Sequence, residues 1–100
     1  MMIQFQIFAG FNAAGGDCSP ATVARNRDYL LAICDTNLEN YTLQDVTGRW
    51  KGGTERSAIV TFIGTRQHAE LIRKVAGEYK DAADQESVLV TDTAINADFV

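Results

Sequence analysis

The segment Ala58-Ile59-Val60-Thr61-Phe62-Ile63 is the most apolar stretch of the chain, and it is apolar on both faces that a strand would present. The pair Gly52-Gly53 precedes it, and such a pair between two strand-like runs is typical of a hairpin turn. We therefore expect residues 55–63 to form a central strand, or a strand whose second face meets a partner.

Working outward from this hairpin, the residue patterns predict two more strands and two helices. Ile3, Phe5 and Ile7 alternate with other residues, which is typical of a strand with one buried face. Ser19-Pro20 predicts a helix start, because serine caps free N–H groups and proline loses nothing at the first helical position. The predicted elements are strands at about 2–9, 41–51, 55–63 and 87–93, with Gly48 as a bulge, and helices from Ser19 to about Asp35 and from Thr65 to about Ala83.

This order predicts a single α+β domain over residues 1–100 with the ferredoxin-like plan β-α-β-β-α-β. Its four strands would form an antiparallel sheet in the order 4-1-3-2, and both helices would cover one face. Whether residues 94–100 pair as a strand is left open. The other face would carry Gln4, Gln6, Phe8, Ser57, Ile59, Thr61, Ser87, Leu89 and Thr91.

That second face mixes aliphatic and small polar side chains, and such a face is rarely left bare in water. A second copy of the chain, the C-terminal tail or a ligand would cover it. We expect a homodimer or a higher homo-oligomer that associates through this open sheet face.

Composition and charge indicate which kinds of partner the chain can bind and in which cellular compartment it is expected. The net charge is −4, so the chain lacks the positive field that long nucleic acid requires, while a small anionic ligand held by local arginines stays possible. The N-terminus has no signal-peptide pattern and no stretch has the apolar length of a membrane span, which predicts a cytoplasmic protein without membrane contact. Two cysteines and one histidine give no zinc pattern, so we expect no metal and no cofactor.

Charged and polar residues gather where the predicted strands begin and end. Because strands three and four both flank strand one, their first residues are expected at the same end of the sheet, beside the end of strand two. Arginine would clamp an anion, tryptophan would stack on a ring, and a carboxylate would accept hydroxyl protons. The alternative is that the two glutamates form ion pairs with the two arginines. The candidate ligand-binding residues are Arg49, Trp50, Glu55, Arg56, Gln85, Glu86 and Ser87.

Other chemically capable residues favour structural roles. His68 is expected as an ordinary helix-start histidine, and Cys34 would need contact with it to act as a nucleophile. Arg27 lies on the inner stripe of the first helix; we expect its stem to run along the core edge, with an ion pair to Asp45 or Asp92 as the alternative. Residues 10–16 match no phosphate-loop pattern and are expected to be a flexible connection.

Four short motifs carry a resemblance to a known family. They are Gly48-Arg49-Trp50, Glu55-Arg56-Ser57, Tyr79 at the end of a helix, and Gln85-Glu86-Ser87-Val88. In this order and spacing they resemble a family of small bacterial proteins that is catalogued only as a domain of unknown function. The resemblance covers a little over half of the chain and implies a fold and a set of positions, without a mechanism.

Two functions from different classes follow. The first is a non-enzymatic protein of bacterial or phage origin that binds or sequesters a small anionic or nucleotide-like molecule. The second is a small dimeric α+β-barrel enzyme of the monooxygenase or isomerase type, in which His68, Tyr79 or Arg27 would face a cavity. An oligomeric interaction protein without a ligand is a third reading. We favour the non-enzymatic reading, because no catalytic motif is specific.

Overall fold

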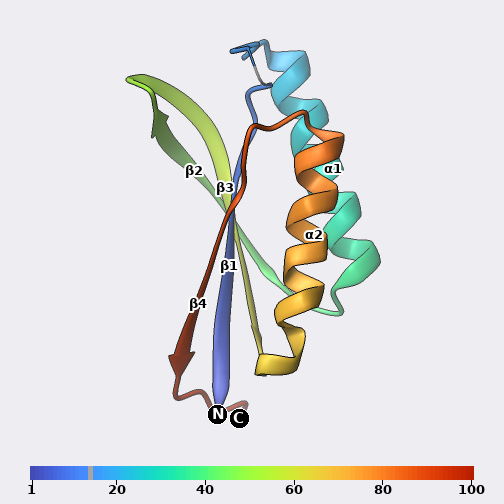
Figure 1. The fold of residues 1–100 in the computed structure, drawn as a ribbon, viewed down its shortest axis with the longest axis vertical. Helices are drawn as coiled ribbons and strands as arrows, with labels where there is room; N and C mark the ends of the chain where they lie inside the picture. The colour runs from blue at the N-terminus through green and yellow to red at the C-terminus, as the bar shows by residue number, and fades with distance from the viewer. Residues whose placement is uncertain (14) are drawn as a thin grey trace.

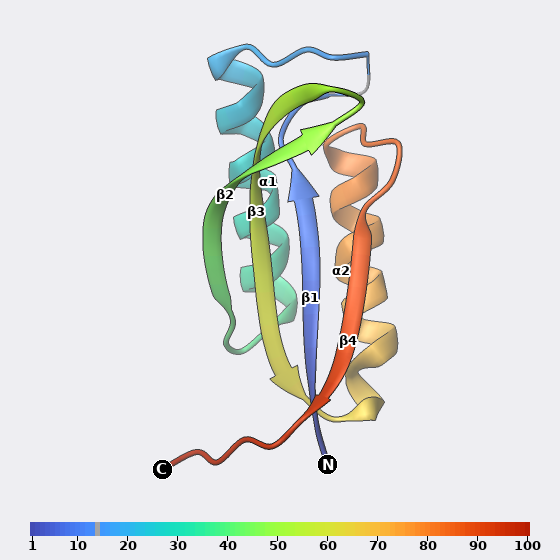
Figure 2. The ribbon, with the colours of Figure 1, turned by 90° about the vertical axis from the view of Figure 1, so that its left-hand side faces the viewer.

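The computed structural model describes residues 1–13 and 15–100, with the side chain of Trp50 outside the described part. Its strands form one antiparallel sheet in the order β2-β3-β1-β4, which confirms the predicted topology and the α+β class. Figure 2 shows the sheet with both helices behind it. The elements are β1 (Met2–Gly10), α1 (Pro20–Asn37), β2 (Thr42–Trp50), β3 (Gly53–Gly64), a 3-10 turn (Arg66–His68), α2 (Ala69–Ala82) and β4 (Leu89–Ile95).

The core lies between the helices and one face of the sheet (Figure 1). Alternate residues of β1 and β3 are buried there, with Phe5 opposite Phe62 in the register. Tyr79 on α2 and Leu30 on α1 pack onto them and are fully buried. The alternate residues of the strands therefore pack against the inward-facing residues of the helices, as the sequence pattern predicts.

The structure corrects the start of the last strand. β4 begins at Leu89 rather than at residue 87, because the connection after α2 is longer than predicted. Asp84 turns the chain there with a φ of 53°, and the backbone N–H of Gln85 donates to Lys80 O at 2.9 Å. Ser87 therefore lies in a loop, outside the sheet face that we expected it to join.

Two further expectations were wrong. Gly48 is no bulge, because β2 and β3 keep an unbroken register from Thr42 to Trp50. A Cβ at this position would lie 3.1 Å from the Ser57 hydroxyl oxygen. Arg27 makes a two-pronged ion pair with Asp45, with both nitrogen–oxygen distances at 2.9 Å, which was the alternative to the apolar-stem packing that we favoured.

The C-terminal residues leave the sheet after β4. β4 continues to Ile95, opposite Met2, and residues 96–100 form no strand. The tail runs past the end of the sheet rather than over a face (Figures 1 and 2). Neither helix in the described part of the chain combines the length and hydrophobicity that a bilayer crossing requires.

Candidate functional site

A hollow of about 880 Å³ lies at one end of the sheet, within the size range of small-molecule sites. Four segments meet around it: the end of β1, the β2–β3 hairpin, the loop after β1 and the loop after α2. Figure 1 shows the hairpin curving away from the helices at this end. The hollow therefore opens on the face of the sheet that no helix covers.

One wall of the hollow is apolar. Phe8 stands on β1, directly opposite Ile59 of β3 and Leu89 of β4 in the two strand registers. The three side chains form a row across three adjacent strands, and Leu89 is 60% exposed. An aromatic ring flanked by aliphatic groups is a surface on which a planar ligand ring can pack.

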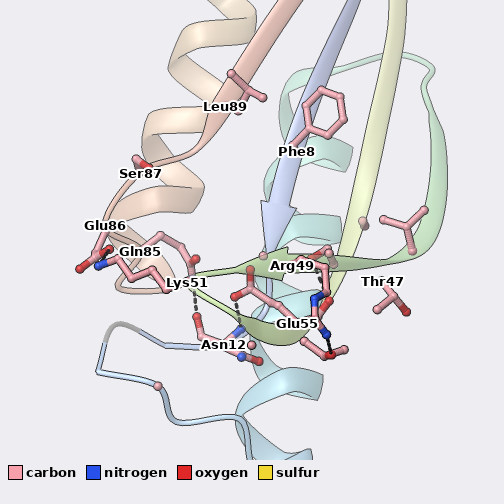
Figure 3. A pocket seen from close by; sticks show the side chains of 18 of the residues that line it. Phe8, Asn12, Thr47, Arg49, Lys51, Glu55, Gln85, Glu86, Ser87 and Leu89 are labelled. Atoms are coloured by element: carbon pink, nitrogen blue, oxygen red, sulfur yellow. Dashed lines mark hydrogen bonds and ion pairs between the residues drawn. The ribbon is translucent and has the colours of Figure 1, made fainter.

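Next to this wall, toward the end of β1, the hollow carries a carboxylate with defined support. Glu55 is half-buried, and its Oε2 accepts a hydrogen bond from the backbone N–H of Asn12 at 3.3 Å (Figure 3). The carboxyl group lies against Gly10 so closely that a Cβ there would be 2.3 Å from Oε1. Among the described residues Glu55 forms no ion pair, so its negative charge is available to a ligand.

The backbone beneath Glu55 is anchored by a buried tyrosine. The Tyr79 hydroxyl donates a hydrogen bond to the carbonyl oxygen of Gly10. Burial, followed by the nearby charge of Glu55, raises the pKa of Tyr79 well above its ordinary value of 10.0. The hydroxyl is therefore a permanent donor at neutral pH, and α2 fixes the end of β1 below the hollow.

The next two residues are anchored from three other segments. Phe11 O accepts from the Asn26 side chain at 2.8 Å, and Phe11 N donates to Arg56 O at 3.0 Å. Asn12 O accepts from the Gln85 amide at 2.6 Å. Because α1, β3 and the loop after α2 all hold this segment, its backbone keeps Asn12 N–H aimed at the carboxylate. This described part of the loop contradicts the flexible connection that we expected.

The cationic residues at the rim are partly committed. Arg49 donates to the Thr54 hydroxyl at 2.8 Å and to Gly52 O at 3.1 Å, which braces the hairpin that bears it. Lys51 pairs with Glu86 at 3.4 Å across the mouth of the hollow, and both are largely exposed. The Lys51–Glu86 pair balances its own charge, whereas Arg49 donates to neutral acceptors and keeps its positive charge at the rim. The Glu55 carboxylate is the acidic group of the hollow that no ion pair among the described residues neutralises.

The predicted site residues divide into two groups. Arg56 does not line the hollow, and the side chain of Trp50 lies outside the described part of the chain. The ion pairs that we expected between the two glutamates and the two arginines are not among the described contacts. The structure brings the other five together around the hollow: Arg49, Glu55, Gln85, Glu86 and Ser87.

Sequence reasoning missed three contributors to the hollow. Phe8 and Leu89 were placed correctly on the open face but were not connected to the site, because only the strand register brings them beside Glu55. Asn12 acts through its backbone, and a backbone donor leaves no signal in residue type. The glycine at position 10 was the available clue, since a missing Cβ marks a close approach of another group.

The candidates for the barrel-enzyme hypothesis lie elsewhere. His68 Nδ1 accepts from the backbone N–H of Thr65 at 3.0 Å, and its ring packs edge-on against Phe62 at 5.0 Å. Cys34 is fully buried, and burial raises the pKa of its thiol to about 11, which makes it a poor nucleophile. Among the described residues there is no group of three or more side chains that could hold a metal ion.

The chain was compared with known proteins. No protein-family model matches it, and no curated protein matches it in sequence. A solved structure of a phage SAM lyase in complex with S-methyl-5'-thioadenosine is similar, with a TM-score of 0.68, 19% identity, and coverage of 92% of this chain and 80% of that chain. The phage SAM lyase in its apo state gives a TM-score of 0.68, 20% identity, and coverage of 91% and 78%.

A de novo designed protein is also similar, with a TM-score of 0.61, 14% identity, and coverage of 96% of this chain and 100% of that chain. At these identities the similarities establish a shared fold and nothing about activity. The resemblance to the bacterial family of unknown function stays a hypothesis.

Proposed function

We propose that this chain is a small-molecule-binding protein of phage origin whose ligand is an adenosine thioether or its sulfonium counterpart. The observation that carries the proposal is the hollow, in which an aromatic–aliphatic wall lies next to a supported carboxylate. The similar fold of a phage lyase that was solved with S-methyl-5'-thioadenosine supports the choice of ligand class.

The parts of such a ligand match the parts of the hollow. The purine ring would pack on Phe8, with Leu89 along its edge. Ribose hydroxyls would donate to the Glu55 carboxylate, which accepts such hydrogen bonds through two oxygens. The carboxylate also favours a cationic sulfonium over a phosphate, so we now place a nucleoside ahead of the anionic ligand that the sequence suggested.

Binding is tested by thermal unfolding with four compounds: S-methyl-5'-thioadenosine, S-adenosylmethionine, adenosine and AMP. A ligand at about ten times its Kd would stabilise the fold by about 1.4 kcal/mol, which raises the Tm of a domain this size by about 5 to 10 °C. The proposal expects a rise with the thioether or the sulfonium and a smaller rise with AMP. Unchanged Tm values with all four compounds would refute it.

A second candidate is cleavage of the sulfonium ligand. Glu55 favours it, because a half-buried carboxylate inside a hollow can act as a general base. In a lyase reaction one carbon–sulfur bond breaks, its electron pair passes to sulfur, and the thioether leaves uncharged. The base takes a proton from the carbon adjacent to the one that leaves sulfur, and the electron pair of that C–H bond forms a carbon–carbon double bond.

This second function has its own readout. S-Adenosylmethionine is incubated with the protein, and S-methyl-5'-thioadenosine is quantified by mass spectrometry. Product that forms with the wild type and is lost in Glu55→Gln assigns an enzyme. Tight binding of S-adenosylmethionine without product supports a non-enzymatic binding protein, which is the hypothesis that the sequence favoured.

A further inference from the structure

The uncovered face of the sheet is almost free of charge. The strand stretches 2–8, 42–46, 57–63 and 89–95 contain only two charged residues, although 22% of the whole chain is charged. Both of these, Asp45 and Asp92, lie opposite buried residues of the next strand and so point to the helix side. There they pair with Arg27 and Arg66. The open face therefore presents only uncharged side chains along these stretches.

We propose that a second copy of this chain packs on the open face and closes the hollow. Two chains of net charge −4 repel each other, and a face without charge is where contact between two copies adds least to this repulsion. A strongly charged partner, such as a nucleic acid or an acidic peptide, would find no opposite charge on this face. Depletion of charge is also the compositional mark of the core of a protein–protein interface.

The face is large enough for a stable contact. The four strands hold 9, 9, 12 and 7 residues, which is about nine on average. At a rise of about 3.3 Å per residue and a strand spacing of about 4.8 Å, the whole sheet face, including its end at the hollow, has a flat area of about 570 Å² per copy. Two copies would bury about 1,100 Å² before side-chain relief is added, which passes the size of about 1,000 Å² expected of a biological interface.

The chain's own tail does not serve as the cover. Residues 96–100 run past the end of the sheet opposite the hollow, and Phe99 is 81% exposed there (Figure 2). The tail therefore does not cover the apolar surface of the open face, and this surface is accessible to a second copy of the chain. Gln6 and Thr61 at its middle hydrogen-bond to each other at 3.2 Å, so their polar groups are partly satisfied within one chain.

The interface and the hollow share residues. Phe8, Ile59 and Leu89 belong to both the open face and the apolar wall of the hollow. A copy seated on the face would cover Leu89 and shield the ligand from water on its open side. This part of the inference rests on the proposed function, whereas the interface itself does not.

The test is the molar mass in solution, measured by light scattering during gel filtration. The wild type is expected at twice the chain mass of 10.9 kDa or more. Thr61→Arg introduces a charge at the middle of the open face and is expected to give monomers. Thr36→Arg adds the same charge on the exposed surface of α1 and is the matched control, expected to keep the wild-type mass. Thr91→Arg replaces Thr61→Arg if circular dichroism shows that the latter is unfolded.

Each outcome decides the inference. A monomeric wild type, or an arginine on the open face that leaves the oligomer mass unchanged, overturns it. If S-methyl-5'-thioadenosine binds a monomeric wild type, the interface is refuted and the proposed function stands. If the wild type is oligomeric and binds none of the adenosine compounds, the function is refuted and the interface stands. Weaker binding to monomeric Thr61→Arg than to Thr36→Arg supports the closure of the hollow.

Discussion

Replacing Gly10 by alanine tests the site through one added methyl group. The new Cβ would lie 2.3 Å from Oε1 of Glu55 and 2.6 Å from its carboxyl carbon. Gly10 does not have a positive φ, so its backbone accepts alanine without strain. The atoms that must move are the end of a flexible side chain, and we therefore expect the carboxylate to swing away while the sheet stays in place.

The effect on stability is expected to be small because two changes oppose each other. Alanine in place of a compatible glycine stabilises by about 0.4 to 1 kcal/mol by restricting the unfolded chain. The hydrogen bond between Asn12 N–H and the carboxylate is long, at 3.3 Å, and its loss costs about 1.5 kcal/mol, the low end of the range for a charged acceptor. The free energy of unfolding should thus stay within about 1 kcal/mol of the wild type.

The effect on binding is expected to be large. A hydrogen bond to a charged group contributes about 1.5 to 3 kcal/mol, so a displaced Glu55 raises the Kd for S-methyl-5'-thioadenosine by about tenfold to a hundredfold. Isothermal titration calorimetry measures this Kd, and urea unfolding measures stability on the same samples.

A matched glycine substitution provides the control. At Gly77 on α2 a Cβ would meet nothing within 4 Å. Gly77→Ala should stabilise the helix by about 1 kcal/mol and leave the Kd unchanged. If Gly10→Ala binds like the wild type while Glu55→Gln does not, the close approach at Gly10 does not set the carboxylate position, and the reasoning fails.

Three further predictions concern the supports of the fold. Tyr79→Phe leaves the Gly10 carbonyl without its donor and should lower the free energy of unfolding by about 1 to 3 kcal/mol in urea; an unchanged value would show that water replaces the hydroxyl. Arg27 holds the pKa of Asp45 below its ordinary value, so this pair stabilises the fold above about pH 4 and the effect is lost as the pH falls. Arg27→Gln should therefore flatten stability between about pH 5 and pH 3, and a slope equal to that of the wild type would contradict the pair. The Cys34 thiol, with a pKa of about 11 and no exposure, should react with a thiol reagent only after unfolding, and rapid labelling of it in the native protein would contradict its burial.

The strand order could be predicted because it depends on side-chain periods, which residue types record directly. The alternation in β1, the apolar run of β3 and the helical stripes of α1 and α2 indicate the element types, and their order β-α-β-β-α-β matches the plan whose sheet has the order 4-1-3-2. The start of β4 could not be predicted. The Gln85 side chain donates to Asn12 O, 73 residues away in the sequence, and no local propensity encodes a contact between such distant segments.

The candidate site was predictable in its location but not in its chemistry. Topology alone brings Glu55 and Gln85 to one end of the sheet, and both line the hollow. The alternative of ion pairs between the two glutamates and the two arginines was wrong for the described contacts, because those charges were matched only by their expected place at one end of the sheet. In the structure Arg49 donates its hydrogen bonds to the Thr54 hydroxyl and to Gly52 O in its own hairpin, and it forms no ion pair with Glu55.

That difference matters for function, because it decides which charge a ligand meets. Had the arginines neutralised both glutamates, the hollow would have been an apolar depression with a screened rim. Instead a backbone N–H at Asn12 orients Glu55 without cancelling its charge, and a backbone donor cannot move away as an arginine side chain can. A carboxylate held in this way, beside the half-buried Phe8 and the exposed Leu89, is expected to favour an uncharged or cationic ligand with a flat ring. An anionic nucleotide would bring its phosphate against the same carboxylate, so the ratio of AMP to adenosine affinity measures how far this argument holds.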